Sequence, residues 1–343
     1  MSILKIAQVG CGGMGSWYRH RYNEVEGARL ELVIDTNEEA AKKAAEELNC
    51  RWSTKFEDCL ADDIDVVDIS TPNFLHADQA CAAIEAGKHV IIQKPITPSV
   101  EEAERIVEAA KKTDKNVGMY MSKFNSPLAY DLKRLVQEGH MGYIEATNCR
   151  NAHRGGLTVP AGTWRGDLKK CGGGSFIQLA IHNIDFVQWL LNDKIKTVMA
   201  YSQNTQCPNI GGDDATAAAI QYESGRIGTL SSSYCADRNE CAVYGTKGHF
   251  LLVDDLHLML CLDGEFDGEV IHYHEPGKIV ELPNYERLGL YREENPYDQS
   301  IAFVKAILEG KPAPVSVETG LYDLKVVKAV YESAEKKALV EIK

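Results

Sequence analysis

Six residues near the start of the chain constrain its fold more than any other feature of the sequence. They read GCGGMG, from Gly10 to Gly15, between the apolar run Ile3–Val9 and a stretch, Ser16–Val25, that can continue as a helix. Glycines at this spacing permit a tight turn, a close approach of the backbone to a pyrophosphate, and close packing of helix on strand. The free N–H groups at the helix start also attract an anion. The pattern predicts a dinucleotide-binding turn; the alternative is a glycine-rich turn without a ligand.

An acidic residue indicates which dinucleotide this turn binds. Asp35 ends the second predicted strand, where a carboxylate accepts hydrogen bonds from a ribose 2′-hydroxyl and repels a 2′-phosphate. We therefore expect NAD rather than NADP. Lys42 and Lys43, in the next predicted helix, keep NADP open as the less favoured alternative.

The first 123 residues alternate short β-branched runs with amphipathic helical stretches, which is typical of a parallel α/β sheet. Capping boxes at Thr36 with Glu39 and at Ser99 with Glu102 predict helix starts, and Gly87 ends a helix that begins near Leu75. The predicted strands are Ile3–Val9, Leu30–Asp35, Val66–Ser70, His89–Gln93 and Val117–Met121.

The remainder, residues 124–343, has a different pattern. Helices are expected at Pro127–Glu138, Ser175–Leu191, Pro296–Leu308 and Gly320–Ala334. Consecutive short strands predict a large, mostly antiparallel sheet: Ile144–Arg150, Thr197–Gln203, Ala215–Tyr222, Ile227–Tyr234, Glu240–Tyr244, His249–Val253, Leu256–Leu262 and Val270–Tyr273. We expect two domains, 1–123 and 124–343, with the C-terminal helices packing back on the first.

Two short loops follow predicted strands of the first domain. Thr71-Pro72-Asn73 follows the third strand and Gln93-Lys94-Pro95 follows the fourth. Ligands of open α/β sheets bind at the carboxyl ends of the strands, so both loops are expected to face the cofactor. A lysine held there can donate to a substrate hydroxyl and favour its ionisation; the alternative for Lys94 is a solvated surface lysine.

Charge and cysteine usage exclude several classes of protein. The net charge is −13, and acidic residues exceed basic ones on both sides of residue 123, so neither half is a nucleic-acid module. No apolar stretch is long enough to span a bilayer, and no leader pattern precedes Gly10, so we expect a cytoplasmic protein. The ten cysteines include no C-x-x-C pair, which favours reduced thiols. His272 and His274 lack a third ligand, so no metal site is expected.

In these motifs and their order the chain resembles the Gfo/Idh/MocA oxidoreductases. The matching pieces are Gly10–Gly15, Thr71-Pro72-Asn73 with His76, Gly87–Val90 leading into Gln93-Lys94-Pro95, Trp164-Arg165, Gly172–Gly174 leading into His182 and Asp185, and the helices of Tyr297–Lys343.

The resemblance implies a Rossmann domain followed by an α+β domain whose open sheet covers the nicotinamide and often builds a homodimer or homotetramer. It also implies a sugar or polyol substrate and hydride transfer between nicotinamide C4 and a secondary carbinol carbon. His182 then moves the hydroxyl proton, and Lys94 is the family's lysine. The expected cofactor-binding residues are Gly10, Gly12, Gly13, Met14, Gly15, Asp35, Thr71, Pro72, Asn73, His76, Gln93 and Lys94.

Two positions depart from the family pattern. Gln93 replaces the usual glutamate before Lys94, and Gln178 replaces the aspartate that inositol dehydrogenases carry four residues before the histidine. On a regular helix Gln178, His182 and Asp185 share one face. Gln178 can orient an imidazole or bind a hydroxyl but cannot stabilise an imidazolium by charge; Asp185 either partly substitutes for it or packs within the domain.

The second domain offers further candidates for binding sugar hydroxyls. They are His153 and Arg154 after its first strand, and Trp164 and Arg165 before the glycines, although Trp164 is equally suited to packing. Weaker candidates on the sheet are Asp214, Ser232 and Tyr234.

Three functions are compatible with these features. The first is an NAD-dependent dehydrogenase acting on a secondary alcohol of a sugar, glycoside or cyclitol, with His182 as acid/base and Lys94 polarising the oxygen. The second is a redox-neutral glycosidase, lyase or epimerase that passes through a transient keto-sugar. The third is a non-catalytic NAD-binding sensor, which Gln178 alone favours.

Overall fold

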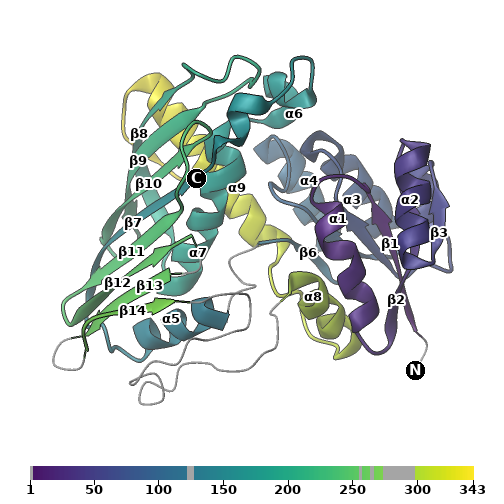
Figure 1. Ribbon diagram of the computed structural model, residues 1–343, viewed down its shortest axis with the longest axis horizontal. Helices are drawn as coiled ribbons and strands as arrows, with labels where there is room; N and C mark the ends of the chain where they lie inside the picture. The colour runs from purple at the N-terminus through teal and green to yellow at the C-terminus, as the bar shows by residue number, and fades with distance from the viewer. Residues whose placement is uncertain (1–2, 122–126, 255–256, 263–265, 273–297) are drawn as a thin grey trace. The chain divides into compact units, whose positions relative to one another are not determined.

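The computed structural model describes residues 3–121, 127–254, 257–262, 266–272 and 298–343. The chain divides into two compact units (Figure 1). The first comprises Met1–Met121 and Asp298–Leu324, and the second comprises Ser122–Tyr297 and Lys325–Lys343. Of the helices in the described ranges, none has the length and apolarity needed to cross a bilayer.

The first unit is built on a six-stranded parallel sheet with the order β3-β2-β1-β4-β5-β6. The strands are β1 (Leu4–Val9), β2 (Ala28–Ile34), β3 (Arg51–Ser53), β4 (Val66–Ile69), β5 (His89–Ile92) and β6 (Val117–Met119). The strand order reverses between β1 and β4, and open α/β sheets bind ligands at such a point. Five of these strands were predicted. The sequence missed β3, which has three residues and two exposed side chains and so lacks an apolar signal.

The helices of this unit confirm some of the predicted caps and bounds and correct others. They are α1 (Gly15–Tyr18), α2 (Glu38–Leu48), α3 (His76–Glu85), α4 (Val100–Ala110) and α8 (Gln299–Leu308). The Ser99 cap is confirmed, because its Oγ accepts a hydrogen bond from the Glu102 N–H. The Thr36 cap was wrong: Asn37 caps α2 through Glu39 N–H and Ala40 N–H. The helix expected over Ser16–Val25 is one α turn followed by a 3₁₀ helix, Arg19–Glu24.

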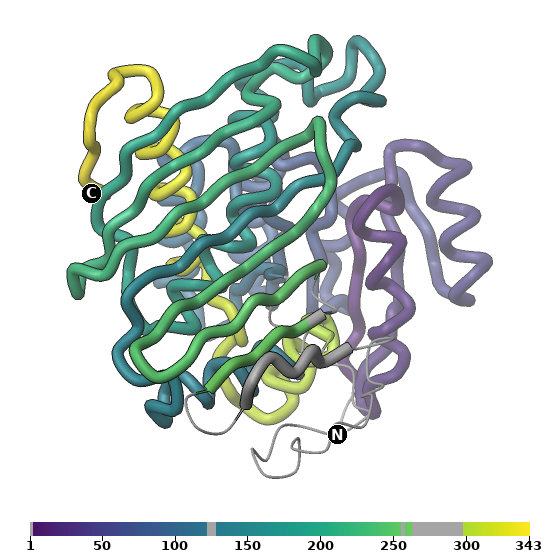
Figure 2. The backbone as a smooth tube through the Cα atoms, turned by 60° about the vertical axis from the view of Figure 1, so that its left-hand side comes forward, coloured from purple at the N-terminus to yellow at the C-terminus, as the bar shows by residue number. Residues whose placement is uncertain are grey.

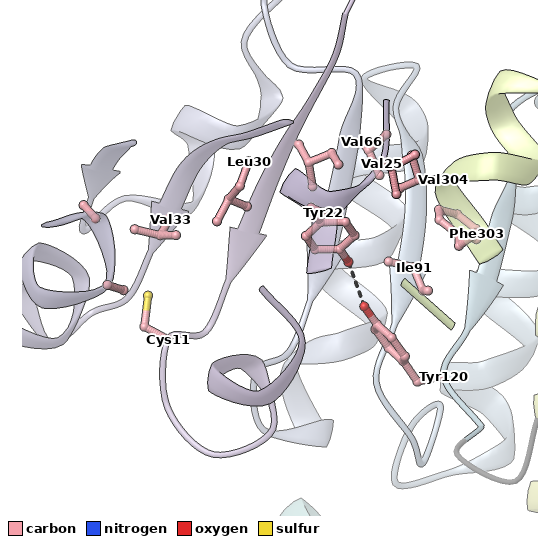
Figure 3. Packing of buried hydrophobic residues seen from close by; sticks show 13 residues of the cluster. Cys11, Tyr22, Val25, Leu30, Val33, Val66, Ile91, Tyr120, Phe303 and Val304 are labelled. Carbon is pink, nitrogen blue, oxygen red and sulfur yellow. Dashed lines mark hydrogen bonds between the residues drawn. The ribbon is translucent and has the colours of Figure 1, made fainter. Parts of the chain in front are cut away.

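The core of the first unit contains a polar pair among apolar side chains (Figure 3). The hydroxyls of Tyr22 and Tyr120 lie 2.7 Å apart and share a hydrogen bond. Tyr22 also donates to Asp68 at 2.9 Å. Burial raises the pKa of this fully enclosed carboxyl. Phe303 and Val304 of α8 pack in the same cluster, so a segment distant in sequence completes the core of the first unit.

The second unit contains a nine-stranded sheet with the order β14-β13-β12-β11-β7-β10-β9-β8-β15. Its strand pairs are antiparallel except β7 with β10, as the sequence predicted in outline. The strands are β7 (Ile144–Ala152), β8 (Ile195–Gln203), β9 (Ala215–Tyr222), β10 (Ile227–Ser233), β11 (Glu240–Gly245), β12 (Gly248–Val253), β13 (His257–Leu262), β14 (Phe266–His272) and β15 (Val340–Glu341). The two-residue β15 was not predicted.

One face of this sheet carries the unit's helices, as Figures 1 and 2 show together. They are α5 (Pro127–Gln137), α6 (Leu168–Cys171), a π-helical turn (Phe176–Ala180), α7 (Ile181–Leu191) and the end of α9 (Val317–Lys336). Along β9 buried and exposed side chains alternate, which is the pattern of a sheet covered on one face. In the described ranges no helix covers the opposite face, which comes forward in Figure 2.

Candidate functional site

The glycines of the first turn have separate roles. Gly10 has φ +98°, and a Cβ on it would lie 2.6 Å from the Ser70 carbonyl oxygen. A Cβ on Gly15 would lie 2.1 Å from the Gly10 carbonyl oxygen. Both contacts are impossible for a real side chain, so these two glycines are required for packing of the turn. A Cβ on Gly12 would meet no atom within 4 Å, which leaves backbone open to a ligand.

Asp35 is anchored beside this turn. It follows β2, and its Oδ2 accepts a hydrogen bond of 2.9 Å from the Cys11 N–H, while Oδ1 accepts one of 2.9 Å from the Asn37 N–H. A carboxylate oxygen has further acceptor capacity, so Asp35 can still accept from ribose hydroxyls. The open backbone at Gly12 and this fixed carboxylate fit an NAD molecule bound at the strand-order reversal.

His76 connects the two loops that the sequence assigned to the cofactor. Its Nε2 lies 2.8 Å from the Thr71 carbonyl oxygen, and its Nδ1 lies 3.1 Å from the carbonyl oxygens of Pro95 and Ile96. The side chain is 1% exposed, and burial lowers the pKa of the imidazole. The structure therefore shows His76 holding the loop after β4 to the loop after β5.

Gln93 and Lys94 follow β5 at the same edge of the sheet. The Gln93 side chain is buried, and its Oε1 accepts a hydrogen bond of 3.0 Å from the Lys94 N–H. Its Nε2 is also buried and has no hydrogen-bond partner among the described residues. The Lys94 side chain is partly exposed, and the peptide bond to Pro95 is cis. In the neighbouring loop the Thr71 hydroxyl donates to Gln79.

In the second unit, Gln178 and His182 are placed in an otherwise buried segment. The structure describes the whole range from Cys171 to Val187. Gln178 and His182 are partly exposed, and all the remaining residues in that range are buried. The regular helix expected from Ser175 was wrong in its first turn, because Phe176–Ala180 is π-helical. π turns occur frequently at functional sites. Asp185 is 2% exposed, unlike the two partly exposed side chains.

Asp213, which no sequence pattern indicated as functional, anchors the start of this helix. Its Oδ1 accepts from the Gly174 N–H at 3.0 Å and from the Tyr331 hydroxyl at 2.7 Å. Its Oδ2 accepts from the Phe176 N–H at 2.9 Å and from the Ser175 hydroxyl at 2.7 Å. Tyr331 in turn accepts from the Ile177 N–H. The first amides of a helix have no intrahelical partners and need others, and here a buried carboxylate and a tyrosine provide them.

The Gly172–Gly174 run permits this anchoring. A Cβ on Gly174 would lie 1.8 Å from the Asp213 carbonyl oxygen, so only glycine allows the two segments to approach. The Lys328 ammonium donates to the Gly172 carbonyl at 2.7 Å. The run GGDD, from Gly211 to Asp214, carries no local signal for this role, because Asp213 lies 37 to 39 positions from the amides that donate to it.

The remaining sugar-binding candidates lie at the surface of the second unit. Arg154 forms an exposed ion pair of 3.0 Å with Asp237. The Arg165 guanidinium stacks 4.4 Å from the Trp164 ring centroid. His153 is exposed, and its Nδ1 accepts from the Gly155 N–H at 2.9 Å.

The weaker sheet candidates are enclosed: Asp214 is 0%, Ser232 2% and Tyr234 6% exposed. Of the two histidines rejected as metal ligands, His272 ends β14 and His274 lies outside the described residues.

Comparison with known proteins gives two matching family models. The NAD-binding Rossmann fold of the Gfo/Idh/MocA oxidoreductase family matches residues 4–121, and the family's C-terminal alpha/beta domain matches residues 133–342.

Curated relatives and solved structures match most or all of the chain. The 1,5-anhydro-D-fructose reductase of Ensifer adhaerens is 26% identical over 323 residues, covering 92% of this chain and 91% of that protein. The scyllo-inositol 2-dehydrogenase (NAD(+)) of Bacillus subtilis is 29% identical over 260 residues, covering 73% of each. A levoglucosan dehydrogenase solved in complex with NADH has a TM-score of 0.87 at 22% identity and is matched over 100% of both chains.

Proposed function

The chain belongs to the Gfo/Idh/MocA oxidoreductase family, and on that premise we propose that it is a dehydrogenase or reductase acting on a secondary alcohol of a sugar, glycoside or cyclitol. The names of its relatives support this substrate class, since they act on anhydrosugars and inositols. The observation that carries the assignment is the partial exposure of His182 and Gln178 on a helix start that Asp213 and Tyr331 hold in place.

We assign the binding of NAD to the turn at Gly10–Gly15 and to Asp35. When bound, NAD supplies the nicotinamide C4 position that accepts or returns the hydride. His182 takes the proton of the substrate hydroxyl in oxidation and returns it in reduction. Lys94 donates a hydrogen bond to the same oxygen and favours its ionised form, because a cation stabilises a developing alkoxide.

Gln178 modifies this acid/base chemistry. A neutral amide can orient His182 or hydrogen-bond a substrate hydroxyl, but it does not stabilise the imidazolium by charge. We therefore propose that His182 acts as a base with less electrostatic support than in relatives that carry aspartate at this position. His153, Arg154, Trp164 and Arg165 stay proposed as groups that bind sugar hydroxyls.

The test is NADH formation with a panel of sugars, anhydrosugars and inositols. We expect His182→Ala and Lys94→Ala each to lower kcat by about 100-fold or more, the usual contribution of a positioned acid or base. His140→Ala and Lys112→Ala, at exposed positions, are the matched controls and should keep kcat within about twofold. Full turnover in either active-site variant would remove that residue's role. Product formation without NADH accumulation would reassign the reaction to the redox-neutral class.

A further inference from the structure

A cluster of three side chains in the second unit plays no part in the proposed hydride transfer. Cys207, Asp214 and Cys235 offer two sulfurs and one carboxylate oxygen that all lie within 4.8 Å of one another. The two Sγ atoms are 3.6 Å apart. Cys207 and Asp214 belong to the segment between β8 and β9, and Cys235 follows β10. No spacing pattern in the sequence indicates this cluster, because 28 positions separate the cysteines.

Only one of the two carboxylate oxygens in this cluster has hydrogen-bond partners among the described residues. Oδ2 of Asp214 accepts hydrogen bonds from the backbone N–H groups of Thr205, Gln206 and Cys207, at 2.7, 2.6 and 3.2 Å. Oδ1 is buried and has no hydrogen-bond partner among the described residues. The whole side chain is 0% exposed. A buried carboxylate oxygen without a partner is costly, and a cation bound to that oxygen would remove the cost.

The separation of the two sulfurs is close to that of two thiolates on one transition metal. Zinc binds thiolate sulfur at about 2.3 Å in a tetrahedral arrangement, which places two sulfurs about 3.8 Å apart. The observed 3.6 Å is close to that separation and far longer than the about 2.05 Å of a disulfide. Two thiolates with one carboxylate suit zinc, whereas magnesium and calcium require oxygen ligands.

We propose that Cys207, Asp214 and Cys235 form a zinc site with one coordination position left for water. Zinc bound there would connect the β8–β9 segment to the end of β10. Leu179 of the π-helical turn packs in the same apolar cluster as Cys207. Asp213, which directly precedes Asp214, anchors the start of that turn. The metal would therefore brace the segment that holds the His182 helix in place, and its binding does not depend on the substrate or on hydride transfer.

The experiment uses the full chain, reduced with a phosphine and stripped of metal by a chelator, and zinc chloride as the probe. We expect about one tightly bound zinc per chain by elemental analysis and a higher thermal midpoint with zinc. Cys235→Ser and Asp214→Asn should each lower zinc affinity by about 100-fold or more, because each removes one of three ligands. The matched control is Cys81→Ser, a partly exposed cysteine of the first unit, which should bind zinc as the wild type does.

A second measurement on the wild type does not depend on variant folding. Zinc should slow alkylation of Cys235, the partly exposed thiol of the cluster, and leave alkylation of Cys81 unchanged. Cobalt substitution should give a thiolate-to-metal charge-transfer band. The proposal is overturned if reduced wild-type protein binds no zinc, if Cys235→Ser binds it equally well, or if zinc protects both cysteines alike. If His182→Ala lost turnover but bound zinc as the wild type does, the zinc proposal would stand independently of the proposed hydride transfer.

Discussion

At the scale of single residues, two glycines of one turn show that the same residue type has two functions. Gly15 is required because its Cα lies against the Gly10 carbonyl, where a Cβ would approach to 2.1 Å. Gly12 has open space in the direction of a Cβ. Gly15 therefore serves the packing of the protein, and we expect Gly12 to serve the approach of a ligand.

Two alanine substitutions separate these functions. We expect Gly15→Ala to lower the free energy of unfolding by about 3 kcal/mol, because the added methyl overlaps backbone. Gly12→Ala should change it by less than about 0.5 kcal/mol. It should still weaken NAD binding by about tenfold or more, because the methyl occupies the space of the pyrophosphate. Urea unfolding and NAD titration measure the two effects. Equal NAD affinity in Gly12→Ala would show that the backbone at this position does not approach the cofactor.

At the scale of elements, the helix that carries His182 depends on partners distant in sequence. Asp213 lies 37 to 39 positions from the amides whose hydrogen bonds it accepts, and Tyr331 lies 154 positions from Ile177. Burial and the Asp213 charge raise the pKa of the Tyr331 hydroxyl, so it stays protonated and donates to the carboxylate. A π-helical turn leaves more amides without intrahelical partners, and these two side chains bind them.

Substitutions at these two partners should impair the helix without touching the NAD turn. Tyr331→Phe removes the hydroxyl that donates to Asp213, and we expect a loss of about 2 kcal/mol in the free energy of unfolding. Asp213→Asn should cost about 3 kcal/mol, because an amide presents donors where the carboxylate accepts. In folded Tyr331→Phe, kcat should fall several-fold while the KM for NAD stays unchanged.

The matched control for Tyr331→Phe is Tyr201→Phe, whose side chain is 70% exposed and which should behave as the wild type. A parallel rise in the KM for NAD, or an unchanged kcat, would contradict a positioning role of Tyr331. Steady-state kinetics well below the thermal midpoint separate these outcomes from simple unfolding.

At the scale of the whole molecule, buried thiols should make the free energy of unfolding fall as the pH rises into the alkaline range. Burial raises the pKa of Cys11 and of Cys59 from 9.0 to about 12, with the Asp35 charge a further cause at Cys11. Because the folded-state pKa is higher than the unfolded-state pKa, the native protein holds these protons more tightly. The resulting stabilisation is complete below pH 9 and is lost as the pH rises toward 12.

We expect the free energy of unfolding to fall above pH 9 by about 1.4 kcal/mol per pH unit for each such thiol. Cys59→Ala should reduce that slope by the contribution of one thiol, whatever its effect at neutral pH. Thr158→Ala, an exposed position that does not titrate, should leave the slope unchanged. Denaturant unfolding at a series of pH values between 8 and 11 measures it. A slope in Cys59→Ala equal to that of the wild type would show that Cys59 ionises normally in the fold.

Patterns of neighbouring residues determined the general architecture of this protein. The turn at Gly10–Gly15, the alternating runs of the first unit and the consecutive strands of the second follow from backbone conformation and periodic polarity, which neighbours along the chain set. Five strands of the parallel sheet and the antiparallel character of the larger sheet were predicted in this way. NAD as the cofactor was predicted from the glycine turn together with Asp35 at the end of the second strand. His182 is partly exposed, and its role as a reactive residue stays a prediction that the kinetic experiment tests.

Only the tertiary structure decided features that depend on contacts between distant segments. Local signals predicted a regular helix after Ser175, yet Asp213 and Tyr331 bind its first amides and the turn is π-helical. The strands β3 and β15 are too short for a periodic signal and form because a neighbouring strand pairs with them. The cluster at Cys207, Asp214 and Cys235 likewise exists only where two separate segments approach. Spacing along the chain carries no information about such approaches, because the core that enforces them is formed by the whole unit.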